Sequence, residues 1–244
     1  MPIPLPAATA AGLLTGALLV RPLAFHYTAP TGHPLPRHTC PTCDHPLTAT
    51  RPHHLYAISL TRRCPHCANR IGPPPLLPEA LAGLGVAAVL TTGTEVWVTT
   101  AQLWLTVIGA VLVITDASVR RLPDHLTAAA ATGVALLLTA ATTSATTGSL
   151  LRAAEAAAVV GAAFFISLIA GGLSMGDLKL APALAAVLGW HSWTALFWGL
   201  TAGFTLGAAH AAVLLATDRS ATRGRIAFGP ALIVGALAVS TTMS

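Results

Sequence analysis

Eight runs of apolar residues dominate this chain and restrict the folds that it can adopt. They cover approximately residues 7–25, 77–93, 96–116, 125–143, 153–172, 178–191, 193–216 and 227–243. A helix needs about 20 apolar residues to cross the hydrocarbon core of a bilayer. Only 9% of the 244 residues are charged, whereas a soluble domain carries about a quarter. The sequence therefore predicts an all-α polytopic membrane protein with about eight transmembrane helices.

The longest segment between these runs divides the chain into three predicted parts. Residues 1–25 form a first transmembrane helix, which we expect to be retained because neither a charged n-region nor a cleavage pattern accompanies it. Residues 26–76 form an extramembrane loop domain rich in proline and histidine, and residues 77–244 form a membrane domain. The sixth run is short and contains Pro182, so it could be kinked or partly re-entrant.

The basic residues predict the orientation of the helices, because arginine and lysine concentrate in cytoplasmic loops. With eight spans and an outside N-terminus, only Arg152 falls clearly outside, while Lys179 and most arginines fall on the cytoplasmic side. Those arginines are Arg37, Arg51, Arg62, Arg63, Arg70, Arg120, Arg121, Arg219, Arg223 and Arg225. The basic residues are dispersed with few aromatic residues among them, which argues against a nucleic-acid partner. We expect a multi-pass protein in the lipid bilayer of the cell inner (plasma) membrane.

All four cysteines lie in the 26–76 loop as two C-x2-C pairs, Cys40 with Cys43 and Cys64 with Cys67. Two such pairs supply four thiolates to one tetrahedral metal ion. The predicted topology places the loop in the cytosol, where disulfides are disfavoured. Zinc is the first choice as a structural ion, with iron or redox-active thiols as alternatives. A nearby histidine could replace a cysteine, and the candidates are His38, His45, His53, His54 and His66.

Two aspartates, Asp116 and Asp177, lie at the edges of apolar runs that are far apart in the sequence. A carboxylate at the edge of a hydrophobic segment is costly and is therefore often functional. The eight-span topology places both at the cytoplasmic face, and the glycines beside Asp177, such as Gly176, would let another backbone approach it.

A pair of carboxylates held close together can hydrolyse a peptide bond, because the two share one proton. The ionised acid activates water, and the protonated acid hydrogen-bonds the scissile carbonyl. Either aspartate could be the base. The alternative is a structural role, in which each acid caps a helix or pairs with a basic neighbour: Arg120 or Arg121 for Asp116, and Lys179 for Asp177.

Segment 171–180, with the sequence GGLSMGDLKL, resembles the signature of the bacterial prepilin peptidases, the type IV leader peptidases of the A24 aspartic family. That signature is roughly G-G-x-G-x-G-D-x-K-L. Segment 116–127 is similar to the family's other catalytic stretch, an aspartate followed by a basic residue, L-P-D and L-T. The FGPAL segment at 228–232 resembles its final-helix motif. The paired cysteine motifs, followed by PEAL at 78–81, are similar to its N-terminal domain.

The resemblance implies a membrane aspartic endopeptidase with Asp116 and Asp177 as its catalytic residues. The substrates would be type IV prepilins or pseudopilins of protein secretion, cut at the cytoplasmic face after a glycine and ahead of a hydrophobic helix. Some members also N-methylate the new N-terminus with S-adenosylmethionine. Gly16, Arg21 and Pro22 match the family's N-terminal pattern only weakly, which argues against a methyltransferase, whereas the cysteine motifs and Glu79 leave that activity open.

Three further residues are expected to support the site: Gly176, Lys179 and Glu79. Lys179 would pair with Asp177 or with a lipid phosphate, and Glu79 would bind substrate or methyl donor, or pair with Arg70. Ser174 stands where the family signature has a glycine, so we expect less backbone freedom there. This departure favours one alternative, a catalytically inactive, zinc-anchored pilus assembly factor. A proton-coupled transporter is the other alternative, and the oligomeric state is not predicted.

Overall fold

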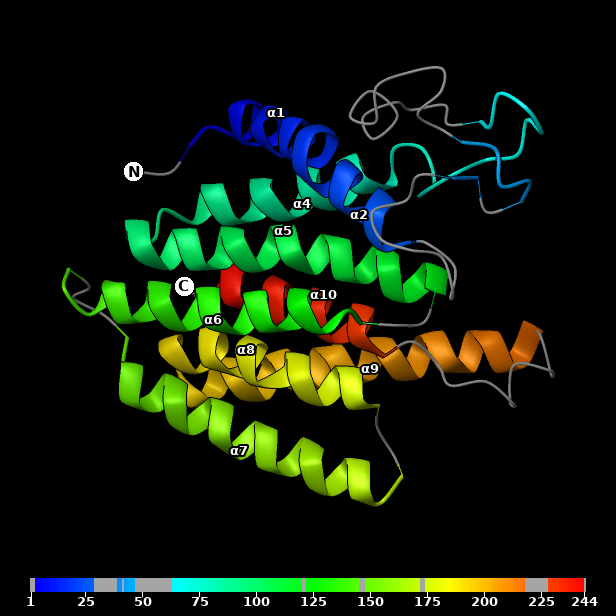
Figure 1. Ribbon diagram of the computed structural model, residues 1–244. Helices are drawn as coiled ribbons and strands as arrows, with labels where there is room; N and C mark the ends of the chain where they lie inside the picture. The colour runs from blue at the N-terminus through cyan, green and yellow to red at the C-terminus, as the bar shows by residue number, and fades with distance from the viewer. Residues whose placement is uncertain are drawn as a thin grey trace.

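Helices make up nearly all of the secondary structure in the computed structural model (Figure 1). The structure describes residues 3–28, 39–40, 42–46, 63–119, 122–144, 148–171, 174–217 and 228–243. Within these residues the β pairing consists of two isolated bridges beside the cysteine motifs, Thr39–Pro46 and Arg63–Arg70. The predicted all-α fold is therefore confirmed.

In the described part of the chain, eight helical segments lie at the eight apolar runs. The first is continuous and consists of α1 (Leu5–Thr15), a π-helical turn η1 (Gly16–Val20) and α2 (Arg21–Tyr27). The others are α4 (Leu77–Thr92), α5 (Val96–Val119), α6 (Asp124–Ala141), α7 (Leu150–Ile169), α8 (Met175–His191), α9 (Trp193–Thr217) and α10 (Gly229–Thr242). The predicted boundaries differ from these by a few residues at most.

Five of the segments are long and apolar enough to cross a membrane: Leu5–Tyr27, Val96–Val119, Asp124–Ala141, Leu150–Ile169 and Trp193–Thr217. Two shorter apolar helices, α4 and α10, accompany them. α8 has 17 residues and continues through Pro182 as a single helix, so the proline does not break the sixth run. The chain is a polytopic helical membrane protein.

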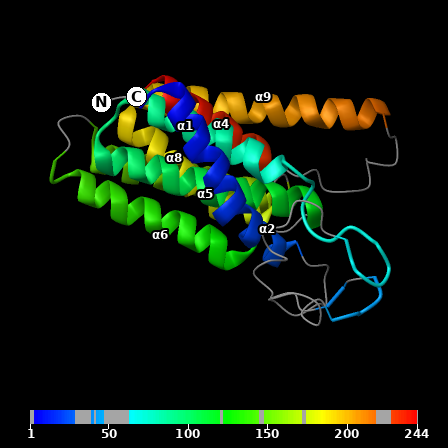
Figure 2. The same ribbon diagram turned by 90° about the horizontal axis from the view of Figure 1, so that it is seen from above.

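α5 is the central helix of the bundle. Of the 18 residues in its most apolar stretch, 67% are buried inside the protein, whereas the corresponding shares are 22% for α7 and 17% for α9. α4, α6 and α10 pack against α5, while α7 packs on α8 and α9 packs on α10 (Figures 1 and 2). The outer faces of α7 and α9 carry exposed Phe165, Ile166, Phe197 and Trp198. These two helices therefore present the surfaces expected to contact lipid.

Glycines allow α1 and α4 to cross at very short range. Gly12 and Gly16 form a G-x-x-x-G pattern on one face of the first segment. A Cβ at Gly12 would lie 2.7 Å from the Cα of Gly83, and a Cβ at Gly16 would lie 2.5 Å from the Cα of Glu79. These separations leave no room for a side chain, so the close backbone contact depends on glycine at both positions.

Arg152, in the first turn of α7, caps the C-terminal end of α8. Its Nε donates to the carbonyl of Gly189 at 2.7 Å, and its Nη2 donates to those of Trp190 and His191 at 2.6 and 2.8 Å. The last carbonyls of a helix have no partner within the helix, and a positive charge is favourable at that end. Arg152 therefore fixes α8 against α7.

The C-terminal end of α5 and the N-terminal ends of α8 and α10 meet at one end of the bundle (Figure 1). The segments that carry the cysteine motifs lie at this end too, and the second of them includes the Arg63–Arg70 bridge. The first turn of α7, which carries Arg152, lies at the opposite end. The remaining arginines that predict the orientation lie outside the described residues: Arg37, Arg51, Arg62, Arg120, Arg121, Arg219, Arg223 and Arg225.

Candidate functional site

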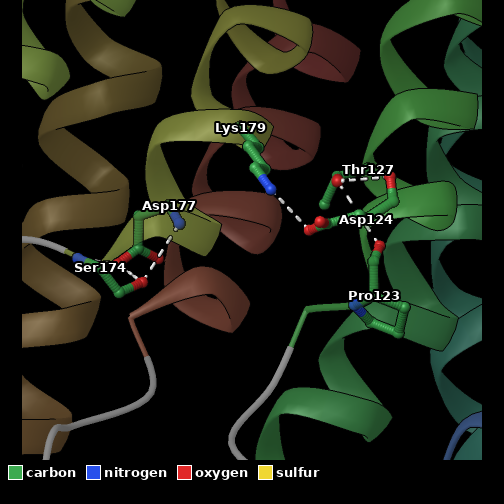
Figure 3. Close-up of polar contacts among 6 residues, drawn as sticks. All are labelled: Pro123, Asp124, Thr127, Ser174, Asp177 and Lys179. Carbon is green, nitrogen blue, oxygen red and sulfur yellow. Dashed lines mark hydrogen bonds and ion pairs between the residues drawn. The ribbon is translucent and has the colours of Figure 1, made fainter.

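Asp177 lies in the first turn of α8, where Ser174 holds its carboxylate (Figure 3). Ser174 Oγ accepts a hydrogen bond from Asp177 N at 3.2 Å and donates one to Asp177 Oδ2 at 2.7 Å. Ser174 N donates to the same Oδ2 at 3.2 Å. This reciprocal pattern is a capping box, and a carboxylate is favourable at a helix N-terminus. Asp177 is only 4% exposed, so the cap orders a buried acid.

Asp116 lies in the last turn of α5 and is 6% exposed. A Cβ at Gly229, the first residue of α10, would lie 3.3 Å from Asp116 Oδ2. The glycine of the FGPAL segment therefore leaves space for this carboxylate beside the helix N-terminus.

Leu122 connects the surroundings of the two acids. Its side chain lies 3.2 Å from the position that a Cβ would take at Gly176, and 3.7 Å from that position at Gly229. Gly176 precedes Asp177 in the chain, and Gly229 lies beside Asp116. The structure thus brings the two aspartates to the same end of the bundle, with Leu122 packed against the backbone next to each.

Asp177 takes part in a helix cap, which is the structural role that the sequence offers as an alternative to catalysis. The cap uses Oδ2, and among the described residues no hydrogen bond to Oδ1 is found. One carboxylate oxygen therefore remains for another partner, so the cap does not exclude a chemical role. Arg120 and Arg121, the expected neighbours of Asp116, lie outside the described residues, as do Gly172 and Leu173 of the signature.

Lys179 does not pair with Asp177. Its Nζ donates to Asp124 Oδ1 at 2.6 Å, which joins the second turn of α8 to the first turn of α6 (Figure 3). The two side chains are 39% and 74% exposed. The pair therefore lies at the surface beside the acids. Its acid, Asp124, is neither of the two partners predicted for Lys179, which were Asp177 and a lipid phosphate.

Glu79 forms a buried ion pair with Arg21, and not with Arg70. Both Nε and Nη2 of Arg21 donate to the Glu79 carboxylate. Arg21 begins α2 and Glu79 lies in the first turn of α4, so the pair fixes the first helical segment against α4 near their glycine contact. Two charged residues at the ends of successive apolar runs are the sequence signal for it.

The four cysteines form one cluster. Their sulfur atoms all lie within 4.8 Å of one another, with Cys40 Sγ 3.7 Å from Cys67 Sγ and Cys43 Sγ 3.6 Å from Cys64 Sγ. Zinc bound to sulfur at about 2.3 Å in a tetrahedron requires sulfur separations of about 3.8 Å. The cluster therefore has the geometry of a four-thiolate metal site and could bind a metal ion.

The two cysteine motifs fold alike. In the first, Cys40 N donates to the carbonyl of His45 and Asp44 N donates to that of Cys40; in the second, Cys64 N donates to Asn69 and Ala68 N to Cys64. Each motif thus makes the same tight turn around its sulfur atoms. His45 and His66 stack on each other with ring centroids 5.3 Å apart. Three other candidate ligands, His38, His53 and His54, lie outside the described residues.

The four neighbouring thiols perturb one another's pKa in opposite directions. Burial raises the pKa of Cys64, but backbone N–H groups of Cys67 and His66 and the neighbouring sulfurs outweigh it, and the pKa falls to about 6. The His45 backbone N–H lowers the pKa of Cys43, but burial and the neighbouring sulfurs together have the larger effect and raise the pKa to about 12. A metal ion bound by all four sulfurs would require the thiols to lose their protons.

The cysteine cluster packs against the helix that carries Arg21. Cys40, Cys64 and Ile71 form a small core with Phe25 of α2, and Phe25 is fully buried there. The contact connects the 26–76 loop to the first helical segment.

Comparisons with known proteins bear on the two aspartates and on the cysteine cluster. The model of the type IV leader peptidase family matches residues 103–217. A protein of Aeromonas salmonicida (strain A449), named "Prepilin leader peptidase/N-methyltransferase", is 32% identical over 162 residues, which are 65% of this chain and 56% of the relative. A protein of the same name from Burkholderia pseudomallei (strain 1026b) is 31% identical over 211 residues, 84% of this chain and 66% of the relative.

This chain belongs to the type IV leader peptidase family. It spans just over half the length of the Aeromonas relative. The segment that the family model matches contains both aspartates and ends before the FGPAL segment, and the cysteine motifs precede it. No solved structure shows a significant match to the chain.

In this leader peptidase family member, the role of Ser174 differs from the loss of backbone freedom expected from the sequence. The residue has a negative φ of −91° in the extended region, which requires no glycine, and its side chain caps α8. The pattern Ser-x-x-Asp at 174–177 is itself a cap signal and could have revealed the contact.

Proposed function

We propose that this chain is an aspartic endopeptidase at the membrane edge, with Asp116 and Asp177 as its two catalytic carboxylates. The observation that carries the proposal is the convergence of two buried acids at one end of the bundle, beside Leu122. The proposed chemistry requires one ionised and one protonated carboxylate, as in a close pair that shares a single proton.

The proposed reaction uses the two acids in complementary protonation states. The ionised carboxylate takes a proton from water, and the resulting hydroxide attacks the scissile carbonyl carbon. The protonated carboxylic acid donates a hydrogen bond to the carbonyl oxygen as negative charge develops there. Collapse of the tetrahedral species breaks the C–N bond, and the leaving nitrogen receives a proton from the acid pair.

Type IV prepilins or pseudopilins are the proposed substrates, and two relatives with prepilin leader peptidase in their names support this assignment. Such a substrate has a hydrophobic helix that can stay in the bilayer while its leader remains outside. Asp116 and Asp177 lie at helix ends, and the proposal requires these ends to lie at the membrane edge, where the two parts of the substrate would meet.

We place the site at the cytoplasmic face of the inner (plasma) membrane. The cysteine-motif segment with the Arg63–Arg70 bridge lies at the same end of the bundle as the two acids, and the first turn of α7, which carries Arg152, lies at the other end. Short cytoplasmic loops carry an excess of arginine and lysine, which supports this orientation.

Zinc is the proposed occupant of the cysteine cluster. Four thiolates at these separations satisfy the coordination of Zn²⁺ fully. A site with four protein ligands keeps no open position for a substrate, so the ion would stabilise the loop and its contact with Phe25 without taking part in hydrolysis.

N-methylation of the newly exposed residue is a second candidate function, with S-adenosylmethionine as the donor. It is supported by the names of the relatives. Incubation with methyl-labelled S-adenosylmethionine and a peptide that already lacks its leader tests this function separately from cleavage. Transfer of label to the peptide N-terminus supports it, and unlabelled peptide contradicts it.

The endopeptidase proposal is tested with purified chain in liposomes and a synthetic peptide that carries a basic leader, a glycine and an apolar segment. Asp116→Asn and Asp177→Asn should each lower kcat by at least about a thousandfold, while Asp124→Asn, an exposed acid at the same end, should retain activity. Substantial cleavage by either buried-acid variant contradicts the assignment. Full pilus assembly without either aspartate would favour the assembly factor, and proton flux without cleavage would favour the transporter.

A further inference from the structure

We propose that Ser174 is a positioning residue for Asp177, so that this chain orders its acid with a hydroxyl where the family signature has a glycine. The inference rests on the proposed peptidase function. It concerns how one carboxylate is oriented, and it does not depend on which of the two acids is the base.

The contacts of Ser174 are directed at one side of the carboxylate. Its Oγ and its N both donate to Asp177 Oδ2, at 2.7 and 3.2 Å. With both donors on Oδ2, the torsions of the Asp177 side chain are fixed and Oδ1 is left for a different partner. Glycine at this position would keep the backbone donor and lose the shorter of the two hydrogen bonds.

The backbone conformation at position 174 neither requires glycine nor excludes it, so it does not explain why serine is present. Ser174 has extended torsions, φ −91° and ψ 158°, which serine adopts without strain. Serine is a favourable N-cap, so a purely structural role as a helix cap is the competing explanation. A test must therefore separate the loss of the cap from the loss of the hydrogen bond to Oδ2.

Ser149 offers a matched control. It is the N-cap of α7, and its Oγ accepts from Arg152 N at 3.2 Å, the distance at which Ser174 Oγ accepts from Asp177 N. Ser149 lies at the opposite end of the bundle from the acids. Ser149→Ala removes a cap of the same kind without touching a carboxylate.

The experiment measures kcat and KM in liposomes with the same synthetic leader peptide. Ser174→Ala and Ser174→Gly should lower kcat about ten- to a hundredfold, the effect of losing a hydrogen bond to a charged group. KM should stay the same because, in this proposal, Ser174 acts only through Asp177. Ser174→Thr, which keeps the hydroxyl, should restore most of kcat. Ser149→Ala should reduce thermal stability as Ser174→Ala does, with kcat unchanged.

Wild-type kcat in Ser174→Ala or Ser174→Gly would overturn the inference while leaving the peptidase function intact. An inactive wild type, or an active Asp177→Asn, would instead remove the peptidase function and the positioning role with it. The contact itself is measured independently by isotope-edited infrared spectroscopy with labelled aspartate. The carboxylate band that Asp177→Asn removes should shift in Ser174→Ala and stay in place in Ser149→Ala, and an unshifted band in Ser174→Ala would contradict the contact.

Discussion

Removing one partner of the Arg21–Glu79 ion pair should destabilise the protein far more than replacing both partners with apolar residues. The two side chains are 1% and 10% exposed, so Arg21→Met or Glu79→Gln would leave the other charge buried. Loss of one member of a buried pair costs about 3–5 kcal/mol. That cost is a factor of roughly 150–5000 in the folding equilibrium and about 6–20 °C in Tm for a chain of this size.

The double variant Arg21→Met with Glu79→Leu removes both buried charges together. Replacement of a buried pair by packed apolar side chains is often close to neutral, so this variant should be more stable than either single variant. The assay is thermal and denaturant unfolding of the full chain in one detergent. Lys179→Met provides the exposed comparison, because a surface pair contributes little, and its Tm should change slightly.

Two results would refute this reasoning. Single variants that unfold at the same temperature as Lys179→Met would mean that Arg21 and Glu79 are not buried against each other. A double variant as unstable as the sum of the two single variants would mean that the two charges do not interact with each other.

Three other changes have expected outcomes in unfolding, activity or metal analysis. Gly16→Ala should cost about 1–3 kcal/mol by overpacking, because its Cβ would lie 2.5 Å from a backbone atom of α4; Gly161→Ala, whose Cβ would meet its nearest atom at an ordinary 3.5 Å, should not, and equal effects would argue against the close crossing. Arg152→Ala removes three hydrogen bonds to the end of α8, so Tm should fall while kcat at low temperature is unchanged; a fall in kcat with an unchanged Tm would contradict its structural role. Elemental analysis should find one zinc per chain, which Cys64→Ser should lose, and metal-free protein with paired disulfides would contradict the four-thiolate site.

The helices could be predicted from the sequence because each one follows an apolar run whose length and polar flanks are visible in the chain. The start of α8 at Met175, ahead of the predicted residue 178, shows where this reasoning stops. Hydropathy alone does not include Gly176 and Asp177 in a helix, whereas the cap at Ser174 stabilises one there.

The partners of charged residues were less predictable because they depend on how helices are arranged in space. From the sequence, Asp177 is the nearest acid to Lys179. Residues two positions apart on a helix do not face each other, and Lys179 reaches Asp124 on α6 instead. Likewise Arg70 is close to Glu79 in sequence, while Arg21 is brought to it by the close crossing of α1 and α4. The gathering of the cysteines was predictable because their spacing alone specifies a tetrahedral ligand set.

The packing of Phe25 makes α2 a wall shared by two cores. Phe25 belongs to the small core around the cysteines, while Val20 and Ala24 on the same segment belong to the main core of the bundle. Any free energy that a metal ion contributes to the small core is therefore transmitted in part to the position of α2. If metal binding favours the packed position of α2 by some factor, then packing of α2 raises the affinity of the cysteines for metal by that same factor. Metal content and integrity of the membrane domain are then expected to change together.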